Sequence, residues 1–218
     1  MNDERQTSDH PPAPWHLRGD MYGAVLRIAT RHIPAQLLPA SHIVGRRRRT
    51  RLIVTAWVDY RDGGVLAYRE LMVAIITRLR PPIRGTLVKV WVNSPPAMIG
   101  GRQLWRIPKE LGEFDLAHDG EQFTASLLVN TVPQATYRFR SRRTLPVRWS
   151  SGLQVVQAHG TGTRSSLGRI TGTIEYGTGT LTVEPGGALA FLRHGTPVTH
   201  LAVRDFRMVA GRRTTDRF

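Results

Sequence analysis

Short alternating runs of apolar and polar residues, separated by Gly, Pro, Ser and Asn, account for most of the chain. A period of two residues is typical of strands with one buried face. The first such run, 52–60, is followed by the turn signal Arg61-Asp62-Gly63-Gly64 and a return run over 65–76, which together predict a hairpin. Further strands are predicted at 86–92, 123–129, 136–140, 154–158, 169–176, 180–183 and 199–209.

Helical patterns are few. Residues 32–39 favour a short helix, with Pro34 in its first turn and Pro39 ending it. The segment 108–112 has proline in front and glycine behind, which predicts a one-turn helix or helical turn. The pattern therefore predicts a mainly β, α+β fold: an antiparallel β-barrel or double sheet with a few short helices.

One domain over 15–210 accounts for the 218 residues, with a disordered leader at 1–14 and a flexible tail at 211–218. No apolar stretch reaches the length of about 20 residues that crosses a bilayer, and the start has no secretory signal. We therefore expect a cytoplasmic protein without membrane contact. The absence of cysteine excludes disulfides and thiolate nucleophiles. The eight scattered histidines do not suggest a metal site, and we expect no cofactor.

The net charge of +15 would ordinarily indicate a nucleic-acid partner. However, no aromatic residues interleave with the basic run Arg46–Arg51, so we interpret it as a solvated turn or interface patch rather than a polyanion site. Of the 31 basic residues only Lys89 and Lys109 are lysines. Only a lysine can present a neutral primary amine as a nucleophile, which makes these two the candidates for amine chemistry.

The segments Tyr68-Arg69-Glu70 and 92–112 (VNSPPAMIGGRQLWRIPKELG) carry several motifs in register. They are a Tyr-x-Glu on a strand, a Pro-Ala after a strand end, a Gly-Arg and an aromatic-x-Pro-Lys turn. In this order and spacing they resemble the acetoacetate decarboxylase family, most strongly over 65–115.

The resemblance implies that Lys109 is a reactive lysine that forms a Schiff base with a small oxo-acid substrate, without a cofactor. Decarboxylation of a β-keto acid is the leading activity. Alternatives are aldol, dehydration or hydration chemistry on a 2-oxo acid with the same lysine, or a barrel that only binds an organic anion. The resemblance also implies a homo-oligomer.

Glu70, the Tyr-x-Glu carboxylate, would position substrate or move a proton. Arg102 and Arg18 are candidates for binding the substrate anion, with Arg27 as an alternative to Arg18 for the family's N-terminal arginine. Glu110, also a candidate substrate-binding residue, stands where the decarboxylases have a second lysine, and next to Lys109 it would oppose loss of the lysine's proton unless it faces away. Ungapped alignment places Thr55 where the family has a second acid, with Asp59 nearby. Lys89 is expected to have a structural or edge role.

Overall fold

The computed structural model describes residues 9–38 and 48–212. Arg46 and Arg47 of the basic run, Pro39 of the predicted short helix, most of the predicted leader and most of the predicted tail lie outside the described residues. The described strands are β1 (Trp15–Ala29), β2 (Thr50–Tyr60), β3 (Tyr68–Arg78), β4 (Ile83–Val92), β5 (Lys109–Leu111), β6 (Glu113–Asp119), β7 (Gln122–Val129), β8 (Val132–His159), β9 (Gly162–Val183) and β10 (Thr196–Arg212). The helices are α2 (Pro95–Trp105) and the 3₁₀ turns η1 (Thr30–His32), η2 (Ala35–Leu37) and η3 (Ala190–His194).

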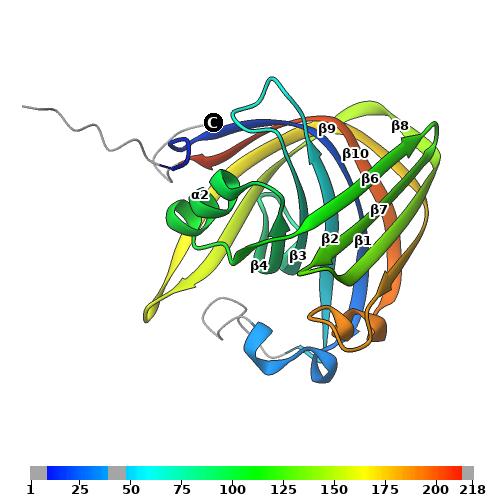
Figure 1. The fold of residues 1–218 in the computed structure, drawn as a ribbon, viewed down its shortest axis with the longest axis horizontal. Helices are drawn as coiled ribbons and strands as arrows, with labels where there is room; N and C mark the ends of the chain where they lie inside the picture. Colours follow the sequence, from blue (N-terminus) through cyan, green and yellow to red (C-terminus); the bar gives the residue numbers. More distant parts are fainter. Residues whose placement is uncertain (1–8, 39–47, 213–218) are drawn as a thin grey trace, which may run out of the picture.

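One ten-stranded sheet, in the order β5-β4-β3-β2-β1-β10-β9-β8-β7-β6, contains all of these strands (Figure 1). Neighbouring strands are antiparallel except β4 and β5, which are parallel. β4 also pairs in parallel with the second half of β8, from Ile83–Leu153 to Gly85–Val155, so the sheet curls back on itself. The mainly β fold with few short helices is as the sequence predicts, although the residues 136–140 and 154–158 belong to the single long strand β8.

Two cores lie on opposite faces of the curled sheet. The β6–β7 core includes Tyr22, Trp57 and Phe123, and Tyr22 stacks on Phe123 at 3.8 Å between ring centroids, so β7 packs over β1 (Figure 1). The α2 core includes Trp15, Val58, Tyr60, Trp105 and Phe206. Trp57 and Val58 are adjacent on β2 but belong to different cores because successive strand residues point to opposite faces.

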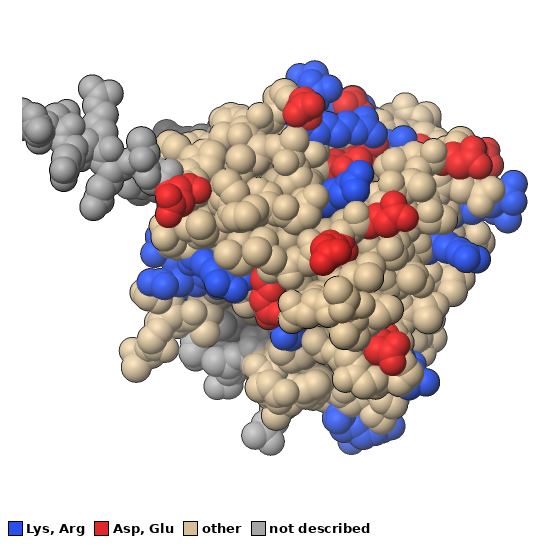
Figure 2. All heavy atoms as spheres, viewed as in Figure 1, with Lys and Arg blue, Asp and Glu red and all other residues tan. Residues whose placement is uncertain are grey.

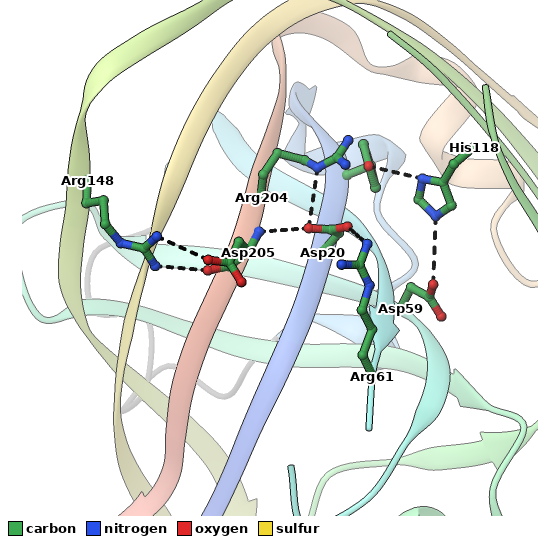
Figure 3. A network of polar contacts seen from close by, with 8 residues as sticks. Asp20, Asp59, Arg61, His118, Arg148, Arg204 and Asp205 are labelled. Atoms are coloured by element: carbon green, nitrogen blue, oxygen red, sulfur yellow. Dashed lines mark hydrogen bonds and ion pairs between the residues drawn. The ribbon is translucent and has the colours of Figure 1, made fainter. Parts of the chain in front are cut away.

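A buried carboxylate, Asp20 on β1, contacts residues of β10 and of the segment that follows β2 (Figure 3). Asp20 forms an ion pair with Arg61 after β2 and another with Arg204 on β10, whose Nε lies 3.3 Å from Asp20 Oδ1. The backbone N–H of Asp205 donates to the same oxygen at 2.7 Å, where the β10 pairing is interrupted. These contacts satisfy a charge that would otherwise be costly to bury.

The segment before β1 packs against α2. His10 Nε2 lies 2.9 Å from Gln103 Oε1, and Trp15 Nε1 donates to Pro11 O at 3.0 Å. Residues 9–14, which the sequence assigns to the leader, thus contribute to the surface that holds α2 in place.

Candidate active site

The segment that carries the candidate lysine begins with a helix that the sequence reading missed. Ser94 caps α2, since its Oγ accepts from the N–H of Ala97 at 3.3 Å, and prolines occupy the first helical positions. Proline is favoured there because its missing N–H would have no intrahelical partner. The helix ends at Arg106, which adopts a left-handed conformation with φ 58°. The prolines at 95–96 therefore start a helix as well as ending β4.

Residues 109–111 form the short strand β5, which corrects the expectation of a helical turn at 108–112. β5 pairs in parallel with β4, with Lys109 opposite Val90. In a strand, neighbours point to opposite faces, so Lys109 is buried whereas Glu110 turns outward. Glu110 Oε1 lies 3.6 Å from Nζ of Lys89, the other lysine of the chain. Glu110 therefore faces away from the lysine nitrogen that it would hinder.

Lys109 is 3% exposed and points at a carboxylate that is equally buried. Its Nζ lies 2.6 Å from Glu70 Oε2 and 3.2 Å from the hydroxyl oxygen of Tyr68. Tyr60 and Tyr68, paired across β2 and β3, each place a hydroxyl about hydrogen-bond distance from Glu70, at 3.5 and 3.4 Å. Burial, reinforced by the charge of Glu70, raises the pKa of both tyrosines, so both remain protonated donors.

α2 fixes the position of the lysine. A Cβ on Gly101 would lie 2.6 Å from Cδ of Lys109, so glycine is needed for the lysine stem to pass the helix. Arg102 Nε donates to the backbone carbonyl of Lys109 at 2.6 Å, and Ile107 N–H donates to Gly101 O. The Gly-Arg pair of the sequence motif thus holds the strand that carries the amine.

Lys109 and Glu70 both line a cavity of about 140 Å³. Its polar side chains are those of Lys109, Glu70, Tyr60, Tyr68 and Ser166. The remaining wall is apolar and comes from β1, β3, β4, β8, β9, β10 and the α2 region: Trp15, Leu17, Met21, Met72, Leu87, Trp105, Ile107, Leu153, Val155, Leu167, Gly168, Met208, Val209 and Ala210. Residues from both ends of the chain are therefore needed to enclose the amine.

The structure brings together Lys109 and Glu70 of the predicted site residues, but it places the other candidates outside the cavity. Arg102 is exposed and bonds to backbone. Arg18 lines a separate pocket with Arg169 and Arg207, and Arg27 lines another at the far end of β1. None of these arginines, nor Glu110, is among the residues that line the lysine cavity.

Thr55 and Asp59 share the other face of β2. Thr55 is buried two residues before Trp57 of the β6–β7 core, and Asp59 lies 3.7 Å from His118 and 3.8 Å from Arg69. Thr55, which stands where the family has a second acid, and Asp59 thus both lie on the face of β2 that points away from the lysine cavity. The cavity side of β2 carries Val58 and Tyr60 instead, and Glu70 is the one carboxylate among the cavity-lining residues.

Tyr60, Tyr68 and Gly101 are site residues that the sequence reading did not assign a role. Tyr68 could have been found from the spacing of Tyr-x-Glu, because residues two apart on a strand share a face. Tyr60 follows from the hairpin register, which pairs it with Tyr68. The role of Gly101 needs the packing of α2 on Lys109, which no local pattern encodes.

The arrangement supplies a buried primary amine, a carboxylate that can exchange a proton with it, and two phenol donors. No group of three or more His, Asp or Glu within residues 9–38 and 48–212 is placed to hold a metal ion. No helix in those same ranges has the length and apolarity to cross a membrane. The buried amine, the carboxylate and the two phenols define a cavity suited to nucleophilic amine chemistry on a carbonyl compound.

Comparisons with known proteins agree with this class. The acetoacetate decarboxylase family profile matches residues 21–158, so the chain belongs to the acetoacetate decarboxylase family. None of the curated protein sequences compared with it matches.

Solved structures share the fold at low sequence identity. Acetoacetate decarboxylase from Legionella pneumophila subsp. pneumophila str. Philadelphia 1 is 16% identical, with a TM-score of 0.70 over 97% of this chain and 90% of that chain. An acetoacetate decarboxylase-like enzyme from Sphingomonas wittichii RW1 is 15% identical, with a TM-score of 0.67 over 97% and 96%. The enduracididine biosynthesis enzyme MppR is 16% identical, with a TM-score of 0.64 over 95% and 89%.

Proposed function

We propose that the protein is a cofactor-independent enzyme that forms a Schiff base between Lys109 and a small oxo-carboxylic acid. The observation that supports this most directly is that Lys109 is buried, lines a cavity and has its Nζ 2.6 Å from Glu70, which lines the same cavity. Glu70 can take the proton of the ammonium and leave the nitrogen lone pair free to attack.

Decarboxylation is the reaction that we assign first. The amine adds to the ketone carbon, and loss of water, with a proton returned by Glu70, gives an iminium ion. The bond to the carboxylate breaks, carbon dioxide leaves, and the electron pair moves into the C–C–N system to give an enamine. Glu70, which takes up a new proton from solvent, then protonates the carbon, and water hydrolyses the resulting iminium ion to release the ketone and the Lys109 amine.

The size and polarity of the cavity favour this reaction over a condensation. Its volume of about 140 Å³ is below the range of about 300–1,000 Å³ typical of drug-sized ligand sites, which suits one small substrate better than two. Its apolar wall also disfavours the carboxylate relative to the products, because carbon dioxide loss removes a charge from a poorly solvating environment.

Aldol, dehydration or hydration chemistry on a 2-oxo acid is the alternative for the same amine. A structural neighbour, MppR, has been solved in complex with pyruvate and shares the fold at 16% identity. The presence of a single carboxylate at the cavity also fits an acid/base set different from that of the decarboxylases. The two reactions differ in product, because only decarboxylation releases carbon dioxide.

Borohydride trapping with acetoacetate and pyruvate tests the proposal. We expect a reduced adduct on Lys109, located by peptide mass spectrometry, and none with Lys109→Met, which keeps an apolar stem but has no amine. Lys89→Met is the matched control, since it removes the only other lysine and should still be labelled. An acetoacetate adduct without the carboxyl group indicates decarboxylation before reduction. Labelling that persists in Lys109→Met, or no adduct with either acid, would contradict the proposal.

A further inference from the structure

The pocket that Arg27 lines lies at the ends of β1, β2 and β3 that are distant from Tyr60 and Tyr68. Its volume is about 430 Å³. The residues that line it are Arg27, Arg48, Thr50, Arg51, Leu52, Ile76, Thr77, Arg78, Leu79 and Arg80. Five of these ten residues are arginines and none is a carboxylate, so the pocket concentrates positive charge.

The local sequence provides no acid to neutralise these arginines. No Asp or Glu occurs between Met21 and Val58, or between Leu71 and Lys109, which are the stretches that contain the pocket. Arg78 donates to the carbonyl of Pro82. For the other four arginines no ion pair is formed with any residue in the described part of the chain.

Arg51 differs from the exposed arginines of this pocket because its side chain is buried. It is only 8% exposed, and its buried Nε has no hydrogen-bond partner within the described residues. Burial, together with the nearby charge of Arg48, lowers the pKa of Arg51, so the folded chain opposes the charge that this side chain carries. A buried donor without a partner is costly, and an anion in the pocket would relieve that cost.

We propose that this pocket binds the phosphate group of a small organic or inorganic phosphate. Guanidinium groups match phosphate oxygens with paired, charge-assisted hydrogen bonds. A phosphate presents more oxygens and more charge than a carboxylate, so it engages several of the five arginines at once. Arg51 supplies the buried donor, while Arg27, Arg48 and Arg80 supply the exposed rim.

Part of the pocket shares a sheet face with the lysine cavity, whereas Arg51 lies on the same side of β2 as Ile53 and Trp57 of the β6–β7 core and so reaches the pocket from the opposite face. Arg27, Leu52 and Ile76 lie side by side across β1, β2 and β3. Met72, which lines the lysine cavity, lies four residues before Ile76 on β3 and points to the same face. At about 3.3 Å per residue the two positions are about 13 Å apart. The phosphate is therefore one of two things. It is the remote end of a substrate whose carbonyl reaches Lys109, an alternative that rests on the proposed function, or it is a separate small ligand.

Calorimetric titration of the full chain with pyrophosphate at low salt tests the site. We expect Arg27→Gln/Arg80→Gln to weaken binding about tenfold or more, since each lost charge-assisted bond costs about one power of ten. Arg51→Gln should weaken it at least as much. Arg138→Gln, which removes an exposed arginine from β8, is the control and should change the affinity less than twofold. No pyrophosphate binding, or equal losses in Arg138→Gln and the pocket variants, would overturn the proposal.

The same titration of Lys109→Met separates this site from the amine chemistry. Unchanged pyrophosphate affinity in that variant is expected whether or not Lys109 forms an imine. The two ligand sources then differ in borohydride trapping. If the phosphate belongs to the substrate, pyrophosphate should slow trapping of a long phosphorylated ketone but not of pyruvate. If the phosphate is a separate ligand, pyrophosphate should change the trapping rates of the long phosphorylated ketone and of pyruvate by the same factor.

Discussion

The contact between Lys109 and Glu70 joins two groups that are each costly to bury alone. Both residues are at most 4% exposed in their side chains, and the 2.6 Å contact allows a proton to move between them. With the proton on nitrogen they form an ion pair, and with the proton on oxygen the amine is free to react. Tyr60 and Tyr68 donate toward the carboxylate in either state, because burial keeps both phenols protonated.

Glu70→Gln should separate proton transfer from cavity shape. Gln fills the same space and can accept one hydrogen bond from the amine, but it cannot accept a proton at neutral pH. We expect imine trapping by acetoacetate to slow about 100-fold or more, with the fold intact by circular dichroism. Glu113→Gln changes an exposed carboxylate on β6 and serves as the control. A trapping rate within threefold of the unchanged protein would show that Glu70 does not carry the proton.

The identities of the chemically reactive residues were the part of the site that the sequence predicted best. Lysine scarcity and the Pro-Lys motif single out Lys109, and the Tyr-x-Glu motif singles out Glu70. The structure places these two residues in contact, although their chemical roles stay predictions. The substrate-binding candidates Arg18 and Arg102 could not be resolved from sequence, because a guanidinium that lines a cavity and one that bonds to backbone look alike along the chain.

The elements around the amine depend on one another. α2 is short, begins with two prolines and carries adjacent glycines at 100–101, so its sequence is a poor helix by propensity alone. The Ser94 cap and the packing of Gly101 against Lys109 decide its place. The end of β4 before the prolines was therefore predictable from sequence, whereas helix α2 was not. For the same reason the segment 108–112, expected to be a helical turn, contains a strand paired with β4.

Gly101→Ala tests this positioning. The added methyl would lie 2.6 Å from Lys109 Cδ, and since the lysine is buried it has to shift. We expect a loss of about 1–3 kcal/mol in the free energy of unfolding and a larger loss in the rate of imine trapping. Gly186→Ala places its methyl in open space and serves as the control in both measurements. If the two variants trap equally fast, the helix does not set the position of the amine.

The Asp20 network links β1 with β10 and with the segment that follows β2 (Figure 3). Asp20→Ala removes a buried carboxylate that accepts from the N–H of Asp205 and pairs with Arg61 and Arg204. We expect urea unfolding to show a loss of about 2–4 kcal/mol, because these groups lose a buried partner.

A matched comparison uses an exposed ion pair. Glu121 Oε2 lies 3.9 Å from Arg140 Nε on the surface, and Glu121→Ala should cost less than about 1 kcal/mol. Comparable losses in Asp20→Ala and Glu121→Ala would mean that the buried network does not stabilise the packing of β1, β2 and β10.

Over the whole molecule, the positions of the charged residues say more about possible binding sites than the net charge does. Figure 2 shows acidic side chains among basic ones on the face viewed in Figure 1. The stretches without acid on β1 to β4 instead gather arginines in the pocket at the ends of β1–β3. Composition alone gives the sign of the charge, but only the strand register shows which arginines converge.

The closure of the sheet between β4 and β8 is the feature of the whole molecule on which the lysine cavity depends. Three residue pairs join the strands, and two side chains add bonds across the same seam: Thr86 Oγ1 donates to Val156 O and Gln157 Nε2 donates to Leu87 O, both at 2.9 Å. Leu87 and Val155 line the cavity on either side of it. The sequence predicts these strands separately but not their pairing, because the partners are about 70 residues apart.

Thr86→Val and Gln157→Ala each remove one bond across this seam. Each takes a side-chain donor away from a backbone carbonyl at the seam, so we expect a loss of about 1–2 kcal/mol in the free energy of unfolding per variant. Hydrogen exchange should accelerate in 83–90 and 153–158, because local opening of the seam needs less free energy than global unfolding. Gln134→Ala, which removes an exposed side-chain bond at the start of β8, provides the control. Because the seam forms part of the cavity wall, the rate of imine trapping at Lys109 should fall in the variants whose hydrogen exchange at the seam is faster. A variant with faster exchange at the seam and an unchanged trapping rate would show that closure does not shelter the amine.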